Sequence, residues 1–168
     1  MPMIRRFEDI RAWISARELV NQVYETTKKK PFSNDFSLRD QIRRAAISVM
    51  SNIVEGFDAG YRPEFIRFLR LAFRSASEVQ SQLYTALDQK YITNDVFNAV
   101  YEKANQVKKQ INAFITYLKS SKNSSSRISE QPSEYQTGPG NEELEFDVPA
   151  TLFADDTDFN QATRRPSN

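Results

Sequence analysis

The chain has 168 residues, of which 39% are hydrophobic and 27% charged, and this length suits one domain with an extension. It contains no cysteine and no histidine, which excludes disulfides, thiolate metal sites, histidine bases and Ser-His-Asp triads. No apolar run approaches the ~20 residues that cross a bilayer, and the N-terminus lacks the apolar core of a signal peptide. We therefore expect a cytoplasmic protein without a cofactor, a metal site or a membrane partner.

Four segments of the chain have helical periodicity. The first extends from about Phe7 to Lys29. Its apolar residues recur at steps of three and four, which places them on one face: Ile10, Trp13, Ala16, Val20 and Val23. The second begins near Ser37, a predicted N-cap with Asp40 three residues later, and Gly60 is suited to end it. It presents Ile42, Ala46, Val49 and Ile53.

The third helix, from about Pro63 to Lys90, has the most regular apolar seam. The seam consists of Phe65, Leu69, Ala72, Ala76, Val79, Leu83 and Ala86. Ile66 and Phe73 lie beside it, so the apolar face is wider than one neighbouring helix requires, and we expect these two residues at an interface between copies.

The fourth helix follows a predicted N-cap at Thr93 and extends to about Leu118. Its seam consists of Phe97, Val100, Ala104, Val107, Ile111, Phe114 and Leu118. Because the connections between the four helices are short, consecutive helices are expected to be antiparallel neighbours. The fold class predicted is therefore all-α, an antiparallel up-down four-helix bundle.

The charge divides the chain into two parts. Residues 1–122 contain 20 Lys and Arg against 13 Asp and Glu, whereas residues 123–168 contain 3 against 9. We assign residues 1–122 to the bundle and 123–168 to a disordered acidic C-terminal tail, which begins with a serine run and shows no helical or strand period. Three roles for the tail remain open: a solubilising segment, a docking segment that orders on a partner, or a shield for the basic body.

Arginines on the second and third helices are the candidate nucleic-acid-binding residues. Their spacing puts several of them on common helix faces: Arg39, Arg43, Arg44, Arg67, Arg70 and Arg74. Arginine binds phosphate bidentately and releases counterions from a polyanion, so such a stripe suits an RNA or DNA backbone. The alternative is a solvated helix face that acidic neighbours partly neutralise.

A polar stripe on the second helix is the candidate structural interface. Ser48, Asn52 and Glu55 lie at helical spacing, and small hydroxyl residues permit close approach of another helix. A helix contact or subunit interface is favoured over a ligand site here. Glu55 and Asp58 form only a weak candidate pair for magnesium or acid–base chemistry, so we expect no catalytic residue.

The stretch from Gln41 to Ile92 contains the motif QIRRAAISVMSNIVEG, then EFIRFL, SASE and a terminal YI. In order and spacing it resembles the bacterial four-helix-bundle family first met inside intervening sequences of large-subunit ribosomal RNA genes. The signature positions that match are Gln41, Arg43, Arg44, Ser48, Asn52, Glu55 and Gly56. A departure is Arg74 before Ser75, where the family often has a small residue.

The resemblance implies a ring-like homopentamer and carries no catalytic residue over. A related branch, the accessory variability determinant of diversity-generating retroelements, binds a reverse transcriptase and nucleic acid. We therefore predict a non-catalytic, oligomeric nucleic-acid-binding protein, with RNA as the favoured ligand. The alternative is a protein-interaction adapter, such as an accessory subunit for a retroelement reverse transcriptase. An enzyme, for example a carboxylate-metal nuclease, is the least favoured hypothesis.

Overall fold

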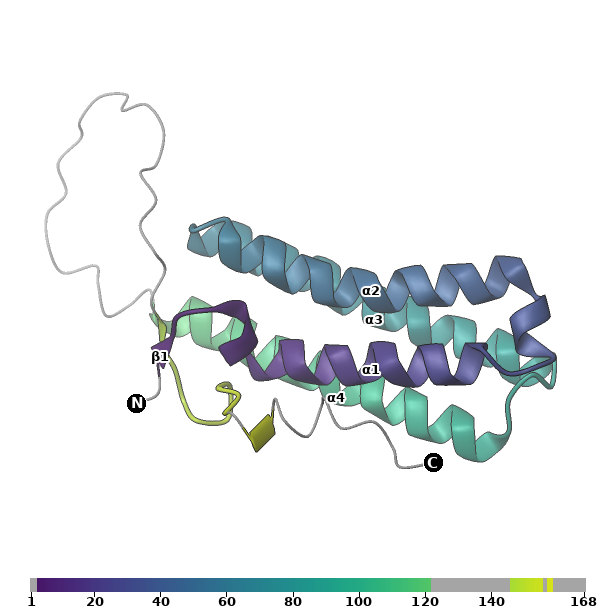
Figure 1. Cartoon of the computed structure of the whole chain (residues 1–168). Coiled ribbons are helices and arrows are strands. Elements are labelled where there is room, and N and C mark those ends of the chain that lie inside the picture. The colour runs from purple at the N-terminus through teal and green to yellow at the C-terminus, as the bar shows by residue number, and fades with distance from the viewer. Residues whose placement is uncertain (1–2, 122–145, 156, 159–168) are drawn as a thin grey trace, which may run out of the picture.

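Four long helices make up the body of the protein. The computed structural model describes residues 3–121, 146–155 and 157–158. The helices are α1 (Arg11–Thr27), α2 (Phe36–Asp58), α3 (Arg62–Asp88) and α4 (Asn94–Ser120). Each packs against two others, because α1 and α3 both contact α2 and α4 (Figure 1). The all-α four-helix class is thereby confirmed, while the antiparallel up-down order stays a prediction.

The start of α2 differs from the expectation. Asp35, rather than Ser37, is the N-cap, because its Oδ1 accepts a hydrogen bond of 3.0 Å from the amide of Leu38. The predicted N-cap of α4 is confirmed, since the Thr93 hydroxyl accepts from the amide of Val96 at 3.3 Å. The first predicted helix is shorter than expected, because the 3₁₀ turn η1 (Phe7–Asp9) precedes α1; a second, η2 (Phe32–Asn34), precedes α2.

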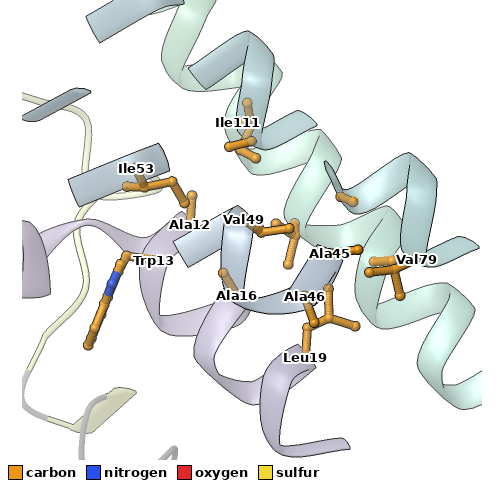
Figure 2. Close-up of a cluster of buried hydrophobic side chains, with 14 of the residues drawn as sticks. Ala12, Trp13, Ala16, Leu19, Ala45, Ala46, Val49, Ile53, Val79 and Ile111 are labelled. Carbon is orange, nitrogen blue, oxygen red and sulfur yellow. The ribbon is translucent and has the colours of Figure 1, made fainter. Parts of the chain in front are cut away.

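The predicted apolar seams form the core. Every seam residue named above is buried except Val20, which is half-buried. Figure 2 shows the centre of this core, where Ala16 of α1 lies near Ala46 and Val49 of α2. The alanine side chains at these positions let α1 and α2 pack closely. The helical spacing of the apolar residues determines which faces of the helices meet.

A segment far along the chain packs against the N-terminus. Strand β1 (Met3–Ile4) pairs antiparallel with β2 (Phe146–Asp147) (Figure 1). Ile10 forms a further antiparallel bridge with Phe153. We call residues 146–155 the C-terminal strap. Its Val148 is 0% exposed and its Leu152 is 6% exposed, so the strap extends the bundle core.

Polar contacts fix the strap in place. The amide of Ala154 donates to the carbonyl of Asp9 at 2.7 Å, and the amide of Arg11 donates to the carbonyl of Leu152 at 3.0 Å. The Arg11 side chain also donates to the carbonyl of Phe153 at 2.9 Å and lies 3.0 Å from the carboxylate of Asp158. The prediction of a disordered tail over 123–168 is therefore corrected for the strap, because backbone pairing and apolar burial offset the entropy of ordering it. Residues 122–145 and 159–168 lie outside the described residues.

Candidate nucleic-acid interface

Helices α2 and α3 meet at Gly56, a signature position. A Cβ atom added there would lie 2.7 Å from Cδ2 of Phe65 and 2.8 Å from Cβ of Phe68. The Phe65 ring cannot move away from such an atom, because it is fully buried and packs edge-to-face on the rings of Phe57 and Phe114. Glycine at this position therefore allows α2 and α3 to approach each other closely.

Ser48, a member of the polar stripe of α2, takes part in the same helix contact. The Ser75 hydroxyl donates to the Ser48 hydroxyl at 3.0 Å, and the Asn52 amide donates to the carbonyl of Ser48 at 2.7 Å. Ser75 is 8% exposed, whereas its neighbour Arg74 is exposed. The close contact thus forms in spite of the large residue at position 74, and Arg74 adds a charge to the outer surface.

The three arginines of α3 form an exposed line. Arg67 pairs with the carboxylate of Glu64, and its guanidinium lies 4.3 Å from the centre of the Phe68 ring. Arg70 and Arg74 are exposed, and within the described part of the chain neither has a hydrogen bond or an ion pair. The guanidinium groups of Arg70 and Arg74 are therefore available to bind an anion from outside the chain.

The three arginines of α2 do not lie together. Arg39 and Arg43 are half-buried on the side of α2 that faces α1, whereas Arg44 is exposed. Arg39 donates to the Asp40 carboxylate at 2.8 Å, and this hydrogen bond, with the nearby charges of Arg44 and Arg43, lowers the pKa of Asp40. The predicted set of six arginines is therefore divided: the α3 line forms one face, Arg39 and Arg43 share a face of α2, and Arg44 lies outside both.

A hollow of about 290 Å³ lies beside the α3 line, where α3 begins and α4 ends. Its apolar lining residues are Pro63, Ile66 and Leu118. Its cations are Arg62, Arg70 and Lys119. Sequence reasoning missed Arg62 and Lys119, because they belong to helices that meet only in the folded chain, and only the helix termini predicted at Pro63 and Leu118 hinted at their proximity.

The family model of the 23S rRNA-intervening sequence proteins matches residues 8–113. The chain belongs to this family. Its fold is similar to the crystal structure of a protein of unknown function from the S23 ribosomal protein family of Bacteroides thetaiotaomicron, with a TM-score of 0.57 and 22% identity over 62% of this chain and 97% of that chain. No curated protein matches the chain. The strap and strand β1 lie outside the residues that the 23S rRNA-intervening sequence protein family shares.

The other residues predicted at an interface differ in their exposure. Gln41 and Glu55 are exposed, and the Gln41 amide donates to the Ser37 hydroxyl at 3.3 Å. Ile66 and Phe73 are half-buried against the core, and Lys108 Nζ lies 4.6 Å from the centre of the Phe73 ring. The wide apolar face of α3 is thus partly covered within the subunit, and the interface between copies stays a prediction.

The described residues contain neither a cluster of metal-ligating side chains nor a membrane-spanning helix. Among residues 3–121, 146–155 and 157–158, no group of three or more acidic side chains is placed to hold a metal ion. Glu55 and Asp58 are both exposed. Over the same residues, no helix is both long and apolar enough to span a membrane.

Proposed function

We propose that this protein binds nucleic acid, with RNA as its ligand, through the outer surface of α3 and the adjoining hollow. The observation that carries the proposal is the pair of exposed arginines, Arg70 and Arg74, that have no partner in the described part of the chain. Unpaired guanidinium groups one helical turn apart are suited to successive phosphates of a backbone. The family description names an intervening sequence of 23S rRNA, so ribosomal RNA is the first ligand to test.

The hollow supports the same proposal. Three cations and three apolar residues line it, so we expect Arg62, Arg70 and Lys119 to bind phosphate and Ile66 to contact a ribose. Arg70 belongs both to the hollow and to the α3 line, which makes it the central residue of the proposed surface. Contacts of this kind bind and position the nucleic-acid backbone, but they do not recognise its base sequence.

We further propose that the protein acts as a homo-oligomer, with a pentamer as the expected form, and without catalysis. Residues 1–122 of each copy contain 20 Lys and Arg against 13 Asp and Glu, so an assembly concentrates positive charge on one particle. Several linked copies of a weak surface bind a long polyanion more tightly than one copy does.

A charge-reversal pair tests the surface. We expect the double variant Arg70→Glu/Arg74→Glu to lose about tenfold or more in RNA affinity at low salt. The slope of the logarithm of the association constant against the logarithm of salt concentration should decrease by roughly two, one for each lost phosphate contact. Fluorescence anisotropy of a labelled, structured RNA measures both.

The matched control is Lys90→Glu/Lys109→Glu, which changes the net charge equally at two exposed residues away from α3's arginine line. It should keep most of the affinity. Equal losses in the two double variants would mean that only net charge matters, and would contradict the proposed surface.

A further inference from the structure

Two exposed aromatic rings stand beside arginines at the corner where α1 leads into α2. Phe36 is 65% exposed and Tyr24 is 40% exposed. The guanidinium of Arg39 lies 4.7 Å from the centre of the Phe36 ring, and that of Arg43 lies 4.5 Å from the centre of the Tyr24 ring. Each ring therefore combines an open apolar surface with a fixed positive charge.

Side-chain and backbone contacts hold both arginines in place. Arg43 Nε donates to the Thr27 hydroxyl at 2.8 Å, and Thr27 is fully buried. Arg39 donates to the Asp40 carboxylate at 2.8 Å and to the carbonyl of Ser33 at 3.2 Å. The two guanidinium groups are thus positioned before any ligand binds, which reduces the entropy that binding would cost.

The rings and charges follow one face of the corner. Phe36, Arg39 and Arg43 are separated by steps of three and four on α2, so they share a side of the helix, and Tyr24 of α1 adjoins Arg43. Phe36 and Arg43 are about 10 Å apart along the helix axis. Because the Tyr24 ring adjoins Arg43 and not Phe36, and stacked bases lie only about 3.4 Å apart, the two rings are suited to separate nucleotides.

The charge around the rings favours an anion. Residues 24–43, which form this corner, include five cations and three carboxylates: Lys28, Lys29, Lys30, Arg39 and Arg43 against Glu25, Asp35 and Asp40. One carboxylate is occupied in the α2 N-cap, one pairs with Lys28 and one pairs with Arg39. The corner therefore retains a positive excess beside its open aromatic surface.

We infer that Phe36 and Tyr24, together with Arg39 and Arg43, form a stacking site for unpaired bases of single-stranded RNA. Aromatic rings stack on the faces of bases irrespective of the base sequence, and adjacent arginines bind the phosphates of the backbone. Bases in a duplex are stacked on each other and do not offer their faces, so the site distinguishes unpaired from paired RNA. This inference rests on the proposed function and adds the form of RNA that is bound.

The experiment compares three probes with the full chain: a labelled oligoadenylate, an oligomer of the same length and charge that lacks bases, and an RNA duplex. We expect the wild type to bind the oligoadenylate more tightly than the base-free oligomer. The double variant Tyr24→Ala/Phe36→Ala should lose about tenfold or more in affinity for the oligoadenylate, and little for the other two probes. Circular dichroism confirms that each variant retains its helices.

The control is Tyr84→Ala. Tyr84 is 51% exposed and packs on Phe97 and Tyr101, but within the described residues no cation lies over its ring. It should leave all three affinities unchanged.

Three outcomes contradict the inference in different ways. If the aromatic variant binds the oligoadenylate as the wild type does, the rings do not stack on bases, while the proposed function stands. If it loses affinity for all three probes alike, the rings serve only to position the arginines. If the wild type binds none of the probes at low salt, both the inference and the proposed function are overturned.

Discussion

Replacing Gly56 with alanine should lower the free energy of unfolding by about 2 kcal/mol, although alanine is the better helix former. The added Cβ would lie 2.7 Å from Cδ2 of the Phe65 ring and 2.8 Å from Cβ of Phe68. Neither neighbour is the flexible end of a long side chain, because one is a fully buried ring and the other atom adjoins the backbone. Helices α2 and α3 must therefore separate, and the overpacking cost exceeds the roughly 1 kcal/mol gained in helix propensity.

Urea unfolding followed by circular dichroism measures this change. Ser51→Ala is the matched control, because Ser51 is exposed on the same helix and alanine there should be neutral or slightly stabilising. A Gly56→Ala variant as stable as the wild type would show that α2 and α3 do not approach each other as described.

The second large effect is expected at the C-terminal strap. Leu152→Asp should release residues 146–155 from the bundle, because Leu152 is 6% exposed and an unpaired carboxylate at this position would have to leave the core. The amides of Ala154 and Arg11, which donate to Asp9 and Leu152, should then exchange their hydrogens roughly 30-fold faster or more. Amides in the middle of α2 and α3 should keep their protection.

Hydrogen exchange of the full chain checks this expectation. Ala150→Asp serves as the control, since Ala150 is an exposed strap residue and the same charge there has no burial cost. Unchanged exchange at Ala154 in the Leu152→Asp variant would mean that apolar burial does not hold the strap.

The sequence was sufficient to predict the helices, because their apolar residues repeat at the helical period. Phe65, Leu69 and Val79 illustrate this, since all three were expected in a seam and all are fully buried. The strap was not predictable in the same way. Val148 and Leu152 have no period, and the strap is held by contacts distant along the chain. These include the Arg11–Phe153 hydrogen bond, with a separation of 142, and the Tyr117–Asp147 hydrogen bond, with a separation of 30.

The candidate site was only partly accessible from the sequence. Spacing placed Arg67, Arg70 and Arg74 on one helix face, and the structure leaves all three exposed. Spacing did not show that Arg62 and Lys119 adjoin Arg70, since this requires the arrangement of α3 against α4. Phe36, three residues before Arg39, is a local signal for an aromatic ring beside a cation, but the spacing of the charges alone does not reveal it.

The most direct test of RNA binding through basic helix faces is the dissociation constant of the full chain for a structured RNA over a series of salt concentrations. We expect the protein to bind at low salt, and the logarithm of its association constant to fall linearly with the logarithm of the salt concentration. The slope should correspond to the release of several counterions, because each arginine that contacts a phosphate displaces condensed counterions. Absence of binding at the lowest salt, or an affinity that does not change with salt, would contradict the account.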